Sequence, residues 1–207
     1  MDKEQTVFVV DDDEGIRDGL GMLLATVGQP YETYGSAAEY LDAYDPDRRG
    51  CLVLDIRMPR ISGLELQEIL NERGSELPII FITGHGDIPM AVEAMRHGAL
   101  DFIRKPFREQ DLLDRINEAL DVELVRRKRS IERNDLIDKI NSLTDRERAV
   151  FESVADGDMN KVIAFDLGIS ERTVEVHRAN AMKKLGVRTL AELIRIKLAV
   201  ESLDSTD

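Results

Sequence analysis

The sequence has one cysteine among 207 residues and no long uncharged apolar run. A single thiol, Cys51, cannot form a disulfide within the chain, as is typical of proteins in a reducing cytosol. Its place in the run CLVLD indicates a small buried side chain. No stretch approaches the roughly 18 apolar residues of a membrane span, and the N-terminus lacks the pattern of a signal peptide. We therefore expect a cytoplasmic protein without a membrane contact.

Internal repeats and low-complexity tracts are also absent, whereas charge is abundant, with 41 acidic and 28 basic side chains. The length suits two domains better than one. Residues 1–125 hold 26 acidic and 12 basic side chains, and residues 126–207 hold 15 and 16. Within residues 172–188, bases outnumber acids five to one. This uneven charge indicates that the two halves meet different partners.

Residues 1–122 alternate short apolar runs with amphipathic stretches. The runs VFVV, CLVLD, PIIFIT and ALDFI, and a weaker one at YETY, are typical of buried strands. Helices are predicted at residues 14–27, 36–44, 62–72, 88–96 and 109–124, with Ser36 and Ser62 as N-caps. This order predicts a doubly wound, flavodoxin-like α/β domain: a five-stranded parallel sheet with helices on both faces. Such sheets bind ligands at the carboxyl ends of their strands.

Residues 123–141 are highly charged and contain neither proline nor glycine, which predicts a helical linker. Its sparse apolar residues leave open a dimeric coiled coil or a solvated helix. Residues 142–200 show only helical patterns and predict a small all-α domain. A last helix is expected at residues 189–200. Residues 201–207 are predicted to form a disordered acidic tail.

The all-α region opens with a capping box, in which Thr144 is the N-cap and Glu147 follows three residues later. Two further helices, at residues 160–167 and 170–185, are joined by a turn at Gly168. Together these two helices have the pattern of a helix-turn-helix.

Carboxylates crowd the end of the first predicted strand, where Asp11, Asp12 and Asp13 precede Glu14. Carboxylates so close together repel one another. They therefore require a nearby cation, or some of them must point elsewhere. Asp13 and Glu14 suit the start of the first helix, where the helix dipole favours negative charge.

The ends of other predicted strands add Asp55, Thr83 and Lys105 to this edge of the sheet. Carboxylates gathered at such an edge form a hard-cation site that suits Mg2+. A carboxylate beside Mg2+ can act as a nucleophile toward phosphorus. The hydroxyl and the ammonium group would then neutralise the phosphoryl oxygens.

Four motifs, VVDDDE, LVLDIRMPRISG, IIFITGHGD and DFIRKPF, stand in one order over residues 5–122. In that order they resemble the receiver domain of two-component response regulators. The resemblance implies that Asp55 is the phosphoacceptor, that Thr83 and Lys105 bind the phosphoryl group, and that Thr83 and Phe102 form the switch. The implied Mg2+ ligands are Asp11, Asp12, Asp55 and the backbone carbonyl of Arg57. Phe102 as a plain core residue is the alternative, and His85 is expected to be a loop residue near the site.

The second helix of the helix-turn-helix pattern has an apolar inner stripe and a basic outer face, which fits a DNA major groove. The stripe contains Val174, His177, Ala181 and Leu185. Residues 140–200 resemble the LuxR-type DNA-binding domain of the NarL/FixJ regulators, and TGHGDIPMAVEAM favours the FixJ branch. His177 is interpreted as structural, and Glu175 either reads a cytosine or is solvated. The residues implied to contact DNA are Lys161, Arg172, Thr173, Glu175, Val176, Arg178, Ala179, Lys183 and Lys184.

We therefore expect a phosphorylation-activated transcriptional regulator of a two-component system. Its expected partners are a sensor histidine kinase, double-stranded promoter DNA, RNA polymerase and, after phosphorylation, a second copy of the chain. It is not expected to be an enzyme beyond its own phosphorylation and dephosphorylation at Asp55.

Three other functions were weighed against this expectation. An aspartyl-phosphate phosphatase would have a general-acid Asp where this chain has Arg57, and it would carry a cap-domain insertion. An RNA-binding antiterminator would lack the helix ISERTVEVHRANAMKKLG. A regulator whose receiver signals without phosphate would not need the complete acidic set.

Overall fold

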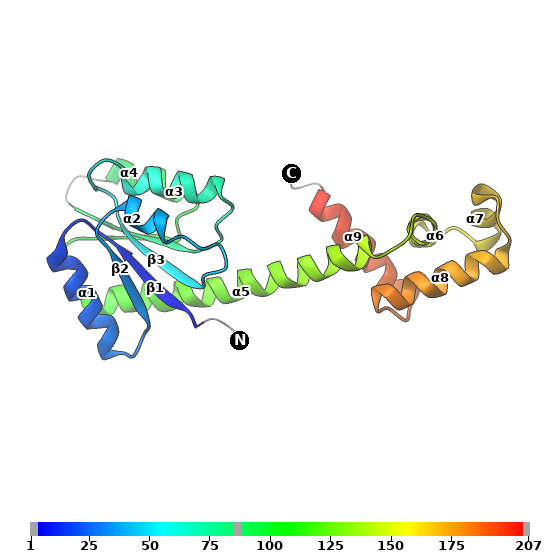
Figure 1. The fold of residues 1–207 in the computed structure, drawn as a ribbon, viewed down its shortest axis with the longest axis horizontal. Helices are drawn as coiled ribbons and strands as arrows, with labels where there is room; N and C mark the ends of the chain where they lie inside the picture. Colours follow the sequence, from blue (N-terminus) through cyan, green and yellow to red (C-terminus); the bar gives the residue numbers. More distant parts are fainter. Residues whose placement is uncertain (1–3, 85–87, 205–207) are drawn as a thin grey trace. The chain divides into compact units, whose positions relative to one another are not determined.

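The computed structural model describes residues 4–84 and 88–204 (Figure 1). The chain divides into two compact units, Met1–Lys128 and Arg129–Asp207, which we describe separately. The expectation for His85 lies outside the described residues. Within the described part of the chain, no helix is both long and apolar enough to cross a membrane.

The N-terminal unit contains a parallel sheet in the order β2-β1-β3-β4-β5. Its strands are β1 (Thr6–Val10), β2 (Tyr31–Tyr34), β3 (Gly50–Asp55), β4 (Ile79–Thr83) and β5 (Asp101–Arg104). Its helices are α1 (Glu14–Thr26), α2 (Ala37–Asp42), α3 (Gly63–Glu72), α4 (Ile88–Arg96) and α5 (Glu109–Asn141). Because β1 lies between β2 and β3, the strand order reverses there, and the carboxyl ends of β1 and β3 flank the switch point. The predicted doubly wound fold is confirmed.

The two faces of the sheet bury separate hydrophobic clusters, and side chains that alternate along each strand fill them. Phe8 and Val10 of β1 point into the cluster beneath α2, α3 and α4. Val7 and Val9 point to the opposite face, which α1 and α5 cover (Figure 1). Cys51 is fully buried in this second cluster, and burial raises the pKa of its thiol to about 12. The interpretation of Cys51 as a small buried residue is therefore confirmed.

Helix starts follow the predicted caps. Ser36 and Ser62 accept backbone N–H bonds at the starts of α2 and α3, and Ser62 with Glu65 forms a capping box. Asp13 is the N-cap of α1 and accepts from the backbone of Gly15 and Ile16. Capping satisfies N–H groups that have no partner inside the helix.

The C-terminal unit is entirely helical in its described residues. After the end of α5, it contains α6 (Asp145–Asp156), α7 (Asn160–Leu167), α8 (Glu171–Leu185) and α9 (Leu190–Asp204). Its buried core includes Val150 and Phe151 of α6, Ile163 of α7 and Val174 of α8. Gly168 and Gly186 end α7 and α8 with φ of 65° and 73°, left-handed conformations that favour glycine.

The last helix differs from the sequence-based expectation, because α9 continues past Val200 to Asp204. The predicted tail from residue 201 therefore starts too early. Glu201 and Leu203 are good helix formers, and no glycine or proline stops the helix there. Residues 205–207 lie outside the described part of the chain.

Candidate phosphoacceptor site and DNA-binding helix

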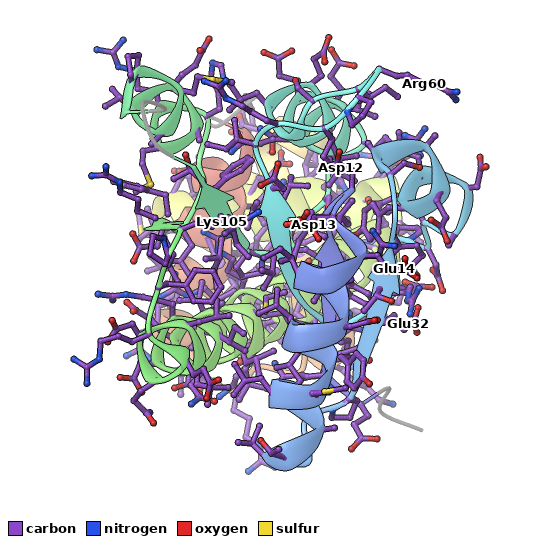
Figure 2. The ribbon with its side chains drawn as sticks, turned by 90° about the vertical axis from the view of Figure 1, so that its left-hand side faces the viewer. Asp12, Asp13, Glu14, Glu32, Arg60 and Lys105 are labelled. Carbon is purple, nitrogen blue, oxygen red and sulfur yellow. The ribbon has the colours of Figure 1, made fainter. Side chains whose placement is uncertain are left out.

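The polar side chains predicted for the receiver gather at the carboxyl end of the parallel sheet. Asp11 follows β1, Asp55 ends β3, Thr83 ends β4, and Lys105 follows β5. In Figure 2, Asp12, Asp13 and Lys105 lie at this end of the unit. Parallel strands bring their ends to one edge, so residues that are 94 positions apart come into contact.

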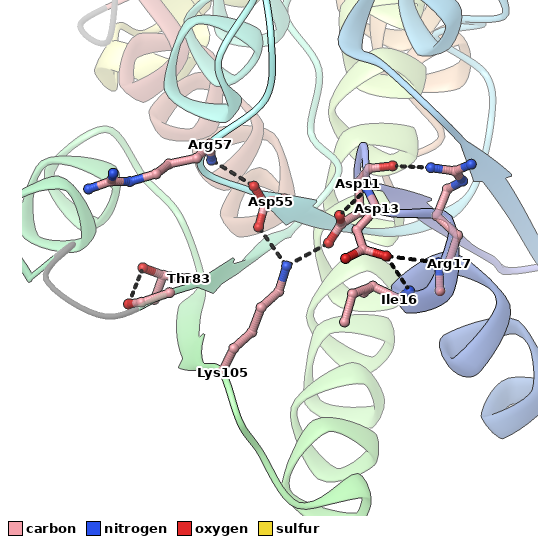
Figure 3. Close-up of polar contacts among 10 residues, drawn as sticks. Asp11, Asp13, Ile16, Arg17, Asp55, Arg57, Thr83 and Lys105 are labelled. Atoms are coloured by element: carbon pink, nitrogen blue, oxygen red, sulfur yellow. Dashed lines mark hydrogen bonds and ion pairs between the residues drawn. The ribbon is translucent and has the colours of Figure 1, made fainter.

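A lysine joins two of the carboxylates. The Nζ of Lys105 lies 2.8 Å from Asp11 Oδ2 and 2.7 Å from Asp55 Oδ1 (Figure 3). Both aspartates are buried, with exposed fractions of 1% and 7%. Burial opposes the lysine's charge, but the hydrogen bonds to Asp11 and Asp55 outweigh it and raise the pKa of Lys105. The ammonium group therefore stays protonated and links β1, β3 and the segment after β5.

Asp55 is a poorly neutralised carboxylate in spite of this contact. Its Oδ2 accepts the backbone N–H of Arg57 at 2.7 Å. Burial raises the pKa of Asp55 and outweighs the lowering effect of Lys105, while nearby Asp11 raises it further. A carboxylate that is crowded by a like charge gains from any additional cation or from phosphorylation beside one.

The three consecutive aspartates divide between two tasks. Asp11 Oδ1 accepts the backbone N–H of Asp13 at 2.9 Å, and Asp12 is exposed at the same edge. Asp13 turns to the start of α1 as its N-cap, with Gly15 N at 2.8 Å from its Oδ1. The expectation that Asp13 opens the first helix is confirmed, and Asp11 and Asp12 are left at the strand end.

The charge at this edge is suited to a divalent cation. Asp11, Asp12 and Asp55 carry three negative charges, and Lys105 supplies one positive charge among them. The described residues contain no group of three or more Asp, Glu, His or Cys side chains close enough to hold a metal by themselves. A cation here would need backbone carbonyl and water ligands as well, which is the mixture that Mg2+ prefers. The donors present therefore fit Mg2+.

The two predicted switch residues differ in their exposure. Thr83 is 4% exposed, and its hydroxyl donates to the carbonyl of Gly84 at 3.3 Å. Phe102 of β5 is 40% exposed. Phe102 is therefore not a plain core residue in this structure, and the alternative that placed it in the core is wrong.

Arg60 is a feature near the site that the sequence reasoning did not identify. Its φ of 71° is left-handed, which is uncommon for a residue other than glycine. Arg60 lines a pocket with Asp12, Ser36 and Pro59 beside the acidic edge. No sequence pattern marked it, because the conformation comes from the turn between β3 and α3.

The second helix of the helix-turn-helix, α8, presents most of the predicted DNA-contacting side chains to solvent. Arg178 and Thr173 are partly buried, and Val176 is 53% exposed. On the opposite side, Val174, Ala181 and Leu185 are buried and His177 is partly buried. Those exposed are Arg172, Glu175, Val176, Ala179, Lys183 and Lys184, with Lys161 exposed on α7.

Lys184 differs from its neighbours because it already has partners within the unit. Its Nζ donates to Glu147 Oε2 at 2.6 Å and to the carbonyl of Ser142 at 2.9 Å. Glu147 also accepts the backbone N–H of Thr144 at 2.9 Å, which completes the predicted capping box. Lys184 and Thr144 lower the pKa of Glu147 to about 2. This cluster joins the start of α6 to the end of α8.

Two apolar side chains at the surface of this unit also escaped the sequence reasoning. Met159 and Phe165 are 72% and 86% exposed. The apolar run MNKVIAF gave no signal for this, because only the helix packing decides which apolar residues of α7 face the core.

Two family models match the chain. The response regulator receiver domain matches residues 7–117, and the luxR family of bacterial regulatory proteins matches residues 141–197. The transcriptional regulatory protein FixJ of Azorhizobium caulinodans is 45% identical over 96% of this chain and 94% of its own length. Nodulation protein W of Bradyrhizobium diazoefficiens is 47% identical over 92% of this chain and 84% of its own length. The structure of the response regulator StyR is 49% identical, with a TM-score of 0.86 over 93% of this chain and 98% of that one.

The fold, the acidic strand end and these similarities define a response regulator. The chain belongs to the FixJ-like two-component regulators, in which a receiver precedes a LuxR-type DNA-binding domain. It is a phosphorylation-activated, DNA-binding transcriptional regulator and not a catalytic enzyme. A receiver implies a histidine kinase as partner, and the C-terminal domain implies DNA.

Proposed function

We propose that Asp55 is the phosphoacceptor of this regulator. The observation that carries the proposal is the contact of one ammonium group, Lys105, with both Asp11 and Asp55 at the sheet edge. An oxygen of Asp55 would attack the phosphorus of a phosphohistidine, forming the O–P bond as the P–N bond breaks, and the imidazole would leave. Lys105 would stabilise charge on the phosphoryl oxygens, as Thr83 would after moving toward them.

Mg2+ would be held by Asp11, Asp12, Asp55 and the backbone carbonyl of Arg57. When bound, it would neutralise the phosphoryl oxygens that meet these carboxylates. The excess of negative charge over Lys105 supports this assignment. Dephosphorylation of Asp55 would occur at the same site with a water molecule as the nucleophile.

Phosphorylation would draw Thr83 toward the phosphoryl group and let Phe102 pack inward. The exposure of Phe102 and the burial of Thr83 support two alternative arrangements of this pair. The changed α4–β5 surface would favour a homodimer, so that two DNA-binding domains act together on one site.

The C-terminal unit would contact promoter DNA through Lys161 of α7 and through Arg172, Thr173, Glu175, Val176, Arg178, Ala179 and Lys183 of α8. Exposure of most of these side chains supports the assignment. Lys184, which we also expected to meet a phosphate, would have to exchange its contacts with Glu147 and Ser142 for one. The bound regulator would act on RNA polymerase in the cytoplasm.

The functional boundaries would follow the sequence pattern, with the receiver at 1–122, the linker at 123–141 and the DNA-binding domain at 142–200.

Labelling with radioactive acetyl phosphate tests the phosphoacceptor. Wild-type protein with Mg2+ should become labelled, and Asp55→Asn should not. The matched control is Asp13→Asn, because asparagine is an equally good N-cap and Asp13 faces α1. Chelation of Mg2+ should abolish labelling of the wild type and of the control. Undiminished labelling of Asp55→Asn would refute the assignment.

A further inference from the structure

The helix α5 carries a run of basic residues that the proposed function does not use. Residues 126–133, RRKRSIER, contain five bases and one acid, Glu132. The whole chain has a net charge of -13, so this run is a local reversal of sign. We call residues 126–133 the basic segment.

The basic segment is exposed and mostly unpaired. Arg126, Lys128, Arg129 and Arg133 are exposed. Arg126 donates to the carbonyl of Glu76 at a long 3.4 Å. Among the described residues, Lys128, Arg129 and Arg133 have no hydrogen bond or ion pair from their side chains.

Other bases of the same helix are paired with acids. Arg115 contacts Asp101 and Glu118, and Lys139 contacts Asp135. In the basic segment, by contrast, Arg126 and Arg129 are three positions apart, and Arg129 and Arg133 are four apart. Like charges at these spacings destabilise a helix by a few tenths of a kcal/mol, roughly 0.2–0.5 per pair. The segment therefore keeps a repulsion that a bound polyanion would remove.

The end of α5 lies beside the helix that is assigned to DNA. Ser142 directly follows α5, and its carbonyl accepts from Lys184 of α8 at 2.9 Å. Arg129 and Arg133 belong to the same compact unit as α8. With about 1.5 Å of rise per residue, Arg133 is roughly 14 Å along the helix from Ser142. Its long side chain is therefore near any duplex that the same unit holds.

We propose that the basic segment is a second DNA-contacting surface, which binds backbone phosphates outside the base pairs that α8 reads. Arginine and lysine side chains on phosphates add affinity without sequence preference, through release of counterions. Arg129 and Arg133 lie on one face of α5, because they are four residues apart, and together they contact one stretch of backbone. Arg126 and Lys128 add to the positive potential around them.

The test compares two duplexes that contain the same site, selected from random DNA by the phosphorylated wild-type protein. One duplex ends at the site, and the other extends about ten base pairs beyond each end. The full-length variant Arg129→Gln/Arg133→Gln should lose affinity only on the extended duplex. Each lost phosphate contact lowers the salt slope by about 0.9, so the slope should fall by about 1.8 per bound protomer. The wild-type advantage should then shrink about tenfold between roughly 50 and 200 mM salt.

Two controls separate this result from its rivals. Arg73→Gln/Arg96→Gln removes the same charge from exposed positions of the N-terminal unit and should leave both slopes unchanged. Arg178→Ala should lose affinity on both duplexes, since it acts at the recognition helix. If Arg178→Ala has no effect, the recognition-helix assignment fails, but the comparison of duplexes still tests the basic segment.

Three results would overturn the proposal. One is an equal loss for Arg129→Gln/Arg133→Gln on both duplexes. A second is an equal change for the Arg73→Gln/Arg96→Gln control, which would show an effect of net charge alone. The third is unchanged DNA binding with altered dimerisation in sedimentation, which would assign the segment to an acidic protein surface.

Discussion

Each half of the molecule contains a lysine that contacts a buried carboxylate, but the two clusters balance charge differently. In the N-terminal unit, Lys105 contacts Asp11 and Asp55, and Asp12 lies at the same edge. In the C-terminal unit, Lys184 contacts Glu147, whose oxygen also accepts the backbone N–H of Thr144. The first cluster has more negative than positive charge, and the second is neutral and satisfied.

This difference separates a reactive site from a structural contact. Burial raises the pKa of Asp55, whereas Lys184 and the capping box lower the pKa of Glu147 to about 2. A charged carboxylate is thus disfavoured at the first site and favoured at the second. Function follows from the charge that remains after pairing, since an ion pair alone is common to both.

Mg2+ should act on only one cluster, and this is the largest effect expected. At about 100 times its dissociation constant, Mg2+ should raise the free energy of unfolding by about 2.7 kcal/mol. Asp12→Asn should reduce this gain, because it removes one carboxylate of the acidic edge. Glu147→Gln should keep it. Calorimetric unfolding with and without Mg2+ measures the gain, and equal gains for wild type and Asp12→Asn would contradict the proposed metal ligands.

Removal of one carboxylate should change stability in opposite directions at the two clusters. In metal-free buffer at pH 7, Asp55→Asn should increase the free energy of unfolding by about 1 kcal/mol, as is common when a functional site is relieved of repulsion. Glu147→Gln should decrease it, because Lys184 and the N-terminus of α6 lose a charged acceptor. Urea unfolding of both variants provides the comparison. A destabilised Asp55→Asn would show that Lys105 fully neutralises its partners.

The pH dependence should also differ in sign. The folded-state pKa of Glu147 lies below its ordinary 4.5, so its contribution is complete above pH 4.5 and is lost as pH falls toward 2. The pKa of Asp55 is raised above 3.8, so its unfavourable contribution is present at neutral pH and is relieved as pH falls to 3.8. The stability gap between wild type and Glu147→Gln should therefore narrow below pH 4.5 in urea titrations. A gap that stays constant down to pH 3 would argue against the low pKa.

The neighbouring residues Lys183 and Lys184 offer the finest comparison. Lys183 is exposed and Lys184 has partners, although the sequence presents them as equivalent. Lys183→Gln should lower the salt slope of DNA binding by about 1 and leave thermal stability unchanged. Lys184→Gln should lower the melting temperature and change the slope less. The reverse pattern would assign the phosphate contact to Lys184.

Much of this architecture was predictable because it depends on local patterns and on parallel-sheet geometry. The alternation of apolar runs and amphipathic stretches predicted the strands and helices, and Ser62 and Thr144 marked helix starts. The site residues Asp11, Asp55 and Lys105 were predictable as neighbours, since each stands at the end of a strand in the same sheet.

What escaped prediction depends on packing between distant segments. The contact of Lys184 with Glu147 spans 37 positions, and nothing in KKLG distinguishes the two lysines. The exposure of Phe165 depends on which face of α7 meets α6 and α8. The end of α9 was misplaced because acidic composition suggested a tail, although the residues themselves favour a helix.

Operator affinity with and without phosphorylation tests the central claim most directly. Full-length wild type and Asp55→Asn would be titrated with the selected duplex at fixed salt and Mg2+, before and after treatment with acetyl phosphate. Coupling between sites commonly changes affinity about 5–150-fold. The account predicts at least a tenfold increase, at about the middle of that range, for wild type and none for Asp55→Asn. An equal increase in both proteins, or none in wild type that carries the label, would contradict it.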